Sequence, residues 1–260
     1  MDRYSLNGRR ALVCGATQGI GRAAAEELAG RGAAVTLFAR DLAALERVRS
    51  ELPGSGHSIL AADFADGDAV RNTAAANVSE RGPVHILVNN TGGPPGGPIA
   101  DAAPDAFVTA FKAHLVNNHQ LVQVVLPGMK AAGYGRIVNI VSTSVREPIP
   151  GLGVSNTIRA SVAGWAKTLA GEVAPFGITV NNVLPGYTKT QRLDTIIAAR
   201  AKAAGREIDD ITKGMLGQVP AGRFAEPWEV AAAIGFLASP AAAYVTGISL
   251  PVDGGRIASL

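Results

Sequence analysis

The sequence has little of what secreted and membrane proteins require. It contains a single cysteine, Cys14, among 260 residues, so no disulfide can form within one chain, which favours a reducing compartment. Every apolar run is broken well before the roughly 18 residues that a membrane span needs. The first residues, Met-Asp-Arg-Tyr-Ser-Leu-Asn-Gly-Arg-Arg, lack the apolar segment of a signal peptide. We therefore expect a soluble, cytoplasmic protein with no membrane partner.

A large excess of one charge is also missing. Lys and Arg number 24 against 21 Asp and Glu, a net charge of +3, whereas a nucleic-acid footprint needs clustered basic residues. The nearest approach to a cluster lies between Lys189 and Lys213, where basic and acidic residues are interleaved. That pattern is typical of a solvated helix face, with a lid that recognises an anion as the alternative. We expect no nucleic-acid partner and no metal site.

Short apolar runs alternate with helical patterns along the whole chain. The runs predict strands at residues 10–15, 34–39, 57–62, 85–89, 136–141, 179–184 and 249–252. The intervening patterns predict helices at 19–31, 42–52, 66–81, 155–174 and 227–238, with a further long helix ending near residue 132. Such alternation predicts a parallel sheet covered on both faces. Since no break in composition divides the chain, we expect residues 1–260 to form one doubly wound, Rossmann-type α/β domain of about seven parallel strands.

The first predicted strand runs into a glycine-rich turn. Its sequence is Gly15-Ala16-Thr17-Gln18-Gly19-Ile20-Gly21. Glycines at this spacing let the backbone approach a pyrophosphate, whose charge is stabilised by the free N–H groups and dipole of the following helix. Because a strand precedes the turn and a helix follows it, we expect a dinucleotide site rather than a packing turn. Cys14, at the strand end, is expected to be a buried structural thiol.

The ends of the next strands predict which dinucleotide binds. Arg40 follows the second strand, where an acidic residue would bind the ribose 2′-hydroxyl of NAD and an Arg would pair with the 2′-phosphate of NADP. We expect NADP(H), with NAD(H) less favoured; the alternative is that Arg40 caps the surface near Asp41. Asp63 is expected to meet the adenine amino group, beside Phe64. Asn90 and Gly92 belong to Asn89-Asn90-Thr91-Gly92, where the Asn90 amide either contacts the ligand or serves the backbone of the turn.

These residues resemble the short-chain dehydrogenase/reductase family over essentially the whole chain. The resemblance rests on motifs in family order and spacing: the glycine turn, Asn89-Asn90-Thr91-Gly92, Gly135-Arg136-Ile137-Val138-Asn139-Ile140-Val141-Ser142, Pro185-Gly186 with Thr188 and Thr190, and Val252-Asp253-Gly254-Gly255. The pattern is most similar to the divergent β-ketoacyl-acyl-carrier-protein reductase-like members. It implies a nicotinamide cofactor held by Pro185, Gly186, Thr188 and Thr190 as well as by the glycine turn, and a homotetramer or homodimer.

The family's catalytic tetrad is Asn, Ser, Tyr and Lys, and this chain departs from it at three places. Ser142 stands at the Ser position, but Ser155 stands at the Tyr position, Arg159 at the Lys position and His114 at the Asn position. Ser155 and Arg159 lie one helical turn apart and so share a face. An aliphatic hydroxyl is a much weaker acid than a phenol, whereas Arg159 still supplies charge and hydrogen bonds to ribose hydroxyls.

Another group is then needed to donate the proton. The hypothesis is that Tyr187 or His114 does so; otherwise Tyr187 packs its loop and His114 bonds to backbone. Ser142, and less favourably Ser144, is positioned to stabilise a carbonyl oxygen. The segment 187–218 resembles the family's substrate lid, with two amphipathic stretches that equally fit a plain packed helix pair.

Two functions are therefore expected. The first is an NADP(H)-dependent short-chain oxidoreductase acting on the carbonyl of a small molecule or acyl thioester, or on a secondary alcohol, with an altered active site. The alternative is a non-catalytic dinucleotide-binding or interaction protein that kept the fold. Ser155 and Arg159 favour the alternative, and Ser142 favours the enzyme.

Overall fold

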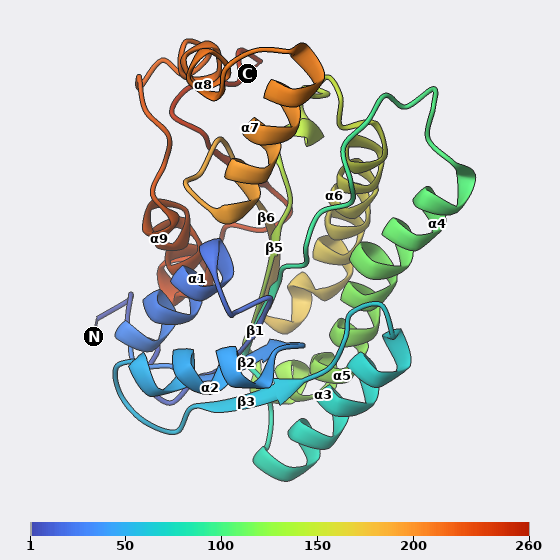
Figure 1. Ribbon diagram of the computed structural model, residues 1–260. Helices are drawn as coiled ribbons and strands as arrows, with labels where there is room; N and C mark the ends of the chain where they lie inside the picture. Colours follow the sequence, from blue (N-terminus) through green and yellow to red (C-terminus); the bar gives the residue numbers. More distant parts are fainter. Residues whose placement is uncertain (1, 260) are drawn as a thin grey trace.

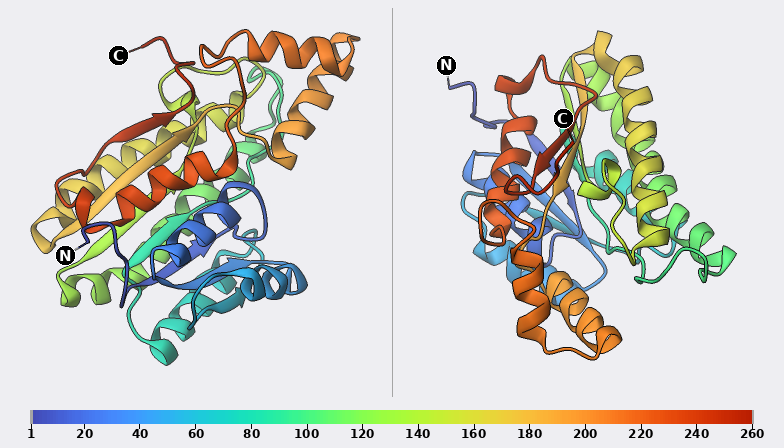
Figure 2. Two further views of the ribbon diagram at one scale, coloured as in Figure 1. Left: turned by 90° about the vertical axis from the view of Figure 1, so that its left-hand side faces the viewer. Right: turned by 90° about the horizontal axis from the view of Figure 1, so that it is seen from above.

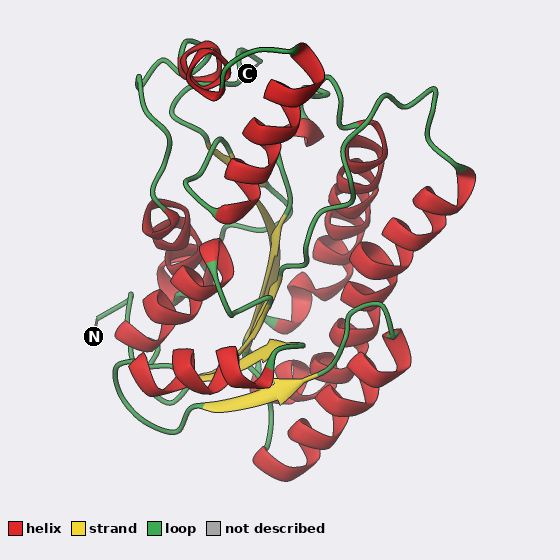
Figure 3. Ribbon diagram, viewed as in Figure 1, coloured by secondary structure: helices red, strands yellow, loops and turns green. Residues whose placement is uncertain are grey.

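Residues 2–259 of the chain are described by a computed structural model, whose centre is one parallel sheet (Figures 1 and 3). The strands are β1 (Arg10–Cys14), β2 (Ala34–Ala39), β3 (Ser58–Ala61), β4 (Ile86–Asn89), β5 (Gly135–Ile140), β6 (Ile178–Pro185) and β7 (Ser249–Val252). They lie in the order β3-β2-β1-β4-β5-β6-β7. The order reverses between β1 and β4, and ligands of open α/β sheets bind at such a switch point, beyond the carboxyl ends of the strands. The predicted fold class is confirmed.

Helices cover both faces of the sheet (Figure 2). They are α1 (Gly19–Gly30), α2 (Leu42–Glu51), α3 (Gly67–Arg81), α4 (Pro104–Phe111), α5 (Asn117–Ala132), α6 (Gly153–Val173), α7 (Gln191–Ala204), α8 (Ile208–Leu216) and α9 (Pro227–Ala238). Buried side chains of α1, α2 and α9 pack on one face, and those of α3, α5 and α6 on the other. None of these helices, within residues 2–259, combines the length and apolar content needed to cross a membrane.

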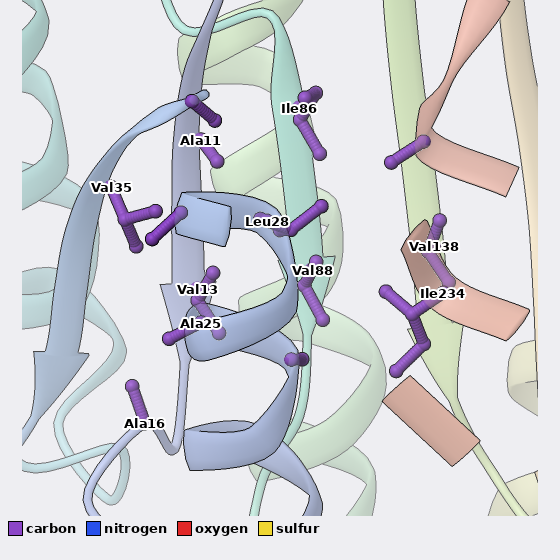
Figure 4. Close-up of a cluster of buried hydrophobic side chains, with 14 of the residues drawn as sticks. Ala11, Val13, Ala16, Ala25, Leu28, Val35, Ile86, Val88, Val138 and Ile234 are labelled. Carbon is purple, nitrogen blue, oxygen red and sulfur yellow. The ribbon is translucent and has the colours of Figure 1, made fainter. Parts of the chain in front are cut away.

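The core explains why the strand sequences are nearly continuous in apolar residues. Leu28 of α1 and Ile234 of α9 are fully buried against Val13, Val88 and Val138 of three strands (Figure 4). Burying a side chain of this size contributes about 1.5–3 kcal/mol. Since both faces of the sheet carry such contacts, each strand must be apolar on both sides.

The expected long helix ending near residue 132 is present but is not uniform. α4 and α5 are joined by a π-helical turn at Lys112–Val116. A π-turn adds a residue to the helix and so redirects the side chains on it. His114, in this turn, is thereby directed into the interior. An apolar period alone does not reveal such a local insertion.

A line of buried amides crosses the sheet. Asn89, Asn139, Asn182 and Ser249 stand at paired positions on β4, β5, β6 and β7. Asn89 donates from Nδ2 to Asn139 Oδ1 at 2.8 Å, and Asn139 donates to Asn182 Oδ1 at 2.9 Å. Asn182 in turn donates to Ser249 Oγ at 3.2 Å. Since buried polar atoms need partners, this asparagine ladder fixes the register of the four strands.

Candidate active site

A cleft of about 950 Å³ opens at the carboxyl ends of the strands. The sequence-predicted residues that line it are Gly15, Thr17, Gln18, Gly19, Ile20, Arg40, Asp63, Phe64, Asn90, Gly92, Ser142, Ser155, Arg159, Pro185, Gly186, Tyr187, Thr188 and Thr190. Gly21, His114 and the less favoured Ser144 do not reach it. The cleft therefore joins the glycine turn at one end to the serine and arginine side chains at the other.

The glycine turn has the backbone that a phosphate cradle requires. Gly15 and Gly19 have φ of +60° and +55°, which side chains with a Cβ rarely adopt. A Cβ on Gly21 would lie 2.1 Å from the Gly15 carbonyl oxygen, so Gly21 acts by letting α1 pack against the turn. Helix α1 begins after Gln18 with no side-chain cap. Its first N–H groups are therefore free to receive an anion.

Asn90 supports this turn from β4. Its Nδ2 donates to the carbonyl oxygens of Cys14 and Gly15, at 3.3 and 3.4 Å. Of the two roles that the sequence left open for the amide, the structure shows the backbone one. Cys14 is fully buried beneath the turn, and burial raises the pKa of its thiol to about 12. A thiol in this environment is protonated and unreactive.

Three further side chains that line the cleft, Arg40, Asp63 and Phe64, come from the loops after β2 and β3. Arg40 is exposed and makes no ion pair within residues 2–259. Asp41 caps α2, accepting from the Ala44 N–H at 2.9 Å, rather than pairing with Arg40. Asp63 accepts from a backbone N–H in its own turn. Phe64 packs against the buried Phe38, with ring centroids 5.1 Å apart. Arg40 is thus free to meet a 2′-phosphate.

Two serines follow β5. Ser142 Oγ accepts from the Ser144 N–H at 3.1 Å, which leaves its hydroxyl hydrogen for another acceptor. The buried Ser144 Oγ has no partner within the described residues, but Ser144 does not line the cleft. Ser142 is therefore the serine whose proton can point at a carbonyl oxygen in the cleft.

Ser155 and Arg159 lie on α6, one turn apart, and both face the cleft. The Arg159 side chain is only 9% exposed, and its Nη1 donates to the Ile140 carbonyl oxygen at 3.2 Å. Burial, together with the nearby charge of Arg192, lowers the pKa of Arg159 to about 10. The guanidinium therefore remains a cation at neutral pH, in a place with little water to screen it.

His114 lies behind the cleft. It is 3% exposed, and its Nδ1 lies 2.5 Å from Thr91 Oγ1. Burial lowers the pKa of His114 to about 3, with the charges of Arg159 and Arg192 acting in the same direction. The imidazole is neutral at neutral pH. Its contact with Thr91, which does line the cleft, makes it a support for that residue.

Tyr187 and the threonines after it come from the end of β6. Tyr187 Oη donates to Gln218 Oε1 at 2.9 Å, and the Arg256 guanidinium lies 4.8 Å from the centre of the Tyr187 ring. Gly186 packs against Asp253, where a Cβ would come within 2.7 Å of its Cα. Thr190 caps α7. The segment thus holds its backbone beside the glycine turn, and Tyr187 borders the cleft while its hydroxyl is bonded to Gln218.

Sequence reasoning missed three cations that line the cleft. They are Lys112, Arg192 and Arg200. Arg192, on α7, donates from Nη2 to the Pro94 carbonyl oxygen at 2.7 Å and so links α7 to the loop after β4. The interleaved charges between Lys189 and Lys213 were the available signal. Charge alone did not show that Arg192 and Arg200 point inward.

A switch-point cleft with a glycine turn, on a sheet of this order, defines a dinucleotide-binding α/β protein. The comparisons with known proteins make this specific. The family model described as enoyl-(acyl carrier protein) reductase matches residues 15–256. The chain belongs to the short-chain dehydrogenase/reductase family.

Individual relatives agree over nearly the full chain. The 3-oxoacyl-[acyl-carrier-protein] reductase FabG of Vibrio cholerae is 36% identical over 251 residues, covering 96% of this chain and 98% of the relative. A structure of a variant actinorhodin polyketide ketoreductase with NADPH superposes with a TM-score of 0.90 at 33% identity, covering 95% and 97% of the two chains. YwfH, an NADPH-dependent reductase of bacilysin biosynthesis, gives 0.92 at 27% identity, covering 97% and 99%.

Proposed function

We propose that the protein is an NADP(H)-dependent oxidoreductase that reduces a carbonyl or oxidises a secondary alcohol. One observation carries the proposal: one cleft joins a glycine turn and Arg40, which has no ion pair within residues 2–259, to Ser142, Ser155 and Arg159. The first set suits a dinucleotide phosphate and the second suits a developing oxyanion. The relatives named above are reductases, which supports the same reaction class.

The residues present fit the cofactor. The turn would collide with a Cβ on Gly21, and its free N–H groups and Arg40 suit a pyrophosphate and a 2′-phosphate. Structural neighbours in the family have been solved with NADP or NADPH bound. When bound, the reduced nicotinamide supplies a hydride. The chain supplies the rest: Thr188, Thr190 and Arg159 border the same cleft as the turn.

Stabilisation of the oxygen falls to Ser142 and Arg159. Ser142 donates its free hydroxyl hydrogen to the carbonyl oxygen and so orients it. Arg159 adds a fixed positive charge in a buried place, where charge stabilisation is worth most. Ser155 offers a second hydroxyl from the same helix face. Positioning of this kind can supply about 7–11 kcal/mol of a barrier.

Proton donation is the step that the altered tetrad weakens. With a pKa of about 3, His114 carries no imidazolium proton at neutral pH, and it lies behind Thr91. Tyr187 borders the cleft, so it is the better candidate donor, although its hydroxyl is bonded to Gln218. A missing general acid costs a factor of about 10² to 10⁴. We therefore expect slow turnover compared with a Tyr and Lys enzyme.

The substrate region lies between the loop after β4 and the segment 187–218, which we propose as the lid. Helices α7 and α8 pack on each other through Leu193, Ile197 and Met215. Ile196 and Leu193 also line the cleft, as do Ile149 and Leu152. An apolar mouth of this kind suits the carbon chain of a small ketone or an acyl thioester.

The family resemblance also implies self-association, and we propose a homotetramer or homodimer through α5 and α6. The outward face of α6 carries small side chains, at Thr157, Ala160, Gly164, Thr168 and Gly171. A Cβ on Gly164 or Gly171 would meet nothing within 4 Å in the chain itself. Small residues let a second helix approach closely, which supports this face as the contact.

The rival is a protein that binds the dinucleotide without turnover, favoured by Ser155 and Arg159. One experiment separates the two. NADPH binding is titrated by its fluorescence, and its oxidation is then followed over a panel of ketones and acyl thioesters. Turnover supports the enzyme. Binding without turnover, converted to turnover by Ser155→Tyr with Arg159→Lys, supports the rival, and failure to bind either dinucleotide contradicts both.

A further inference from the structure

The cleft carries a strong excess of positive charge. Five cationic side chains line it, and Asp63 is its one carboxylate within residues 2–259; the cations are Arg40, Lys112, Arg159, Arg192 and Arg200. Ion pairs elsewhere in the described chain use other residues, and none involves these five. In a chain whose net charge is only +3, five cations against one carboxylate make the cleft distinctly positive, which raises the local concentration of anions.

Among the five cations, Arg159 has the greatest need of a bound anion. A guanidinium has five N–H donors, and here one nitrogen, Nη1, has a protein acceptor, the Ile140 carbonyl. The side chain is nine-tenths buried. A buried charge without a counterion is costly, and proteins normally pair it. Within the described residues its Nη2, which lies beside Gly93 of the cleft lining, has no hydrogen-bond acceptor and is available to a ligand.

Arg192 converges on the same point from the opposite wall. A Cβ built on Gly93 would lie 3.2 Å from Arg192 Nη2 and 3.6 Å from Arg159 Nη2. The two guanidinium groups are thus close enough for one small anion to touch both. The contact of Arg192 with the Pro94 carbonyl holds it there, and Gly93 leaves the space between the two arginines open.

We propose that the substrate carries an anionic group, a carboxylate or a phosphate, bound between Arg159 and Arg192 with the reacting carbonyl directed to Ser142. This rests on the proposed function and narrows it. The substrate is then a small oxo acid or an oxo phosphate, or the corresponding hydroxy compound, rather than a neutral acyl chain. Paired guanidinium groups are the usual protein device for such oxyanions.

The phosphates of the dinucleotide have a cradle of their own. A Cβ on Gly19 would lie 3.2 Å from Thr190 Cγ2, so the phosphate-binding turn closes against Thr190. Arg192 instead reaches across to Pro94, on the loop after β4. The ribose hydroxyls of the dinucleotide can accept hydrogen bonds from Arg159. Because they are neutral, they do not compensate the positive charges of Arg159 and Arg192. An anion on the substrate compensates both.

The test compares three probes on the protein loaded with NADP⁺. They are 4-oxopentanoate, its methyl ester and dihydroxyacetone phosphate, and their dissociation constants are measured by calorimetry. We expect at least one of the two anions to bind about 10- to 100-fold more tightly than the ester, since hydrogen bonds to charged groups are the strong ones. Raising the salt concentration should weaken the binding of the anion and leave the affinity for the ester unchanged. The anion that binds more tightly shows whether the site prefers a carboxylate or a phosphate.

Variants assign the effect to the site. Arg192→Gln should abolish the preference for the anion, while Arg192→Lys keeps part of it and NADPH affinity stays at the wild-type level in both. Lys202→Gln is the matched control, because it removes one charge from the exposed side of the same helix, and it should retain the preference.

Three results overturn the proposal: equal affinity for ester and anions, no binding of either anion, or an Arg192→Gln variant that loses NADPH affinity instead. The NADPH titration is run first. A wild-type protein that does not bind NADPH contradicts the proposed function itself, whereas one that binds NADPH and shows no preference contradicts only the anion site.

Discussion

Gly21 shows how one absent side chain sets up the cofactor turn. A Cβ at this position would sit 2.1 Å from the Gly15 carbonyl oxygen and 2.6 Å from Asn90 Nδ2. Gly21→Ala should therefore lower the free energy of unfolding by about 1–3 kcal/mol, the usual cost of overpacking, and weaken NADPH binding. Gly30→Ala is the control on the same helix, because nothing lies within 4 Å of its Cβ. It should stabilise by about 0.5–1 kcal/mol. Equal stability of the two variants would contradict the packing argument.

His114 makes folding stability depend on pH in a defined direction. Burial, aided by Arg159 and Arg192, lowers the pKa of His114 from 6.5 to about 3. Between these two pH values the imidazole is protonated in the unfolded chain and neutral in the folded one. The stability is complete above pH 6.5 and is lost as the pH falls towards 3, at up to about 1.4 kcal/mol per pH unit. Urea unfolding at a series of pH values measures this.

The control is His114→Asn, which has no titrating ring. His85, whose pKa burial also lowers, is present in both proteins and cancels in the difference. The wild-type curve should fall more steeply than that of the variant below pH 6.5. Parallel curves would show that His114 does not titrate as the structure indicates.

Residue roles were predictable where a backbone or a motif dictates them. The glycine turn and Arg40 follow from motifs at strand ends, and Ser142 follows from the family resemblance. Arg40, Ser142 and the turn residues other than Ala16 and Gly21 line one cleft. The convergence of Arg159 and Arg192 was not predictable. It depends on how α6 and the segment after β6 meet across the loop at Gly93, and no local pattern encodes that approach. The burial of His114 behind Thr91 depends likewise on a π-turn without an apolar signature.

At the scale of elements, the strands were the most predictable part, because burial on both faces demands continuous apolar runs. The asparagine ladder is the exception, since polar residues interrupt those runs at Asn89, Asn139 and Asn182. They are tolerated because each stands opposite the next in register, so that each amide meets another. Pairing between distant strands cannot be read from one strand alone.

The asparagine ladder predicts that substitutions at its centre lower the free energy of unfolding more than substitutions at its end. Asn139→Ala removes the central member and leaves Asn89 Nδ2 and Asn182 Oδ1 without their partners. Each orphaned buried group costs about 1–3 kcal/mol, so urea unfolding should show a loss of about 2–6 kcal/mol. Ser249→Ala, at the end of the ladder, breaks one bond and should cost about 1 kcal/mol. A similar loss in both variants would argue against a connected ladder.

At the scale of the whole molecule, the proposed assembly through α6 can be tested without touching the cleft. Gly164 is exposed, with no atom near its missing Cβ. Gly164→Arg should therefore leave the subunit folded, by circular dichroism, and lower the molar mass measured by light scattering. Gly214→Arg introduces the same side chain at an open glycine of α8 and should keep the wild-type mass. A monomeric wild-type protein would refute the assembly.

The position of Cys14 allows ligand binding at the glycine turn to be followed by the rate at which this thiol is labelled. Because it is the only thiol in the chain and is fully buried under the glycine turn, a thiol reagent can reach it only when that region opens. The labelling rate thus measures the free energy of local opening at the end of β1. NADPH, if it binds there, should slow labelling in proportion to its occupancy, so binding can be followed with no chromophore, no substrate and no added probe in the protein.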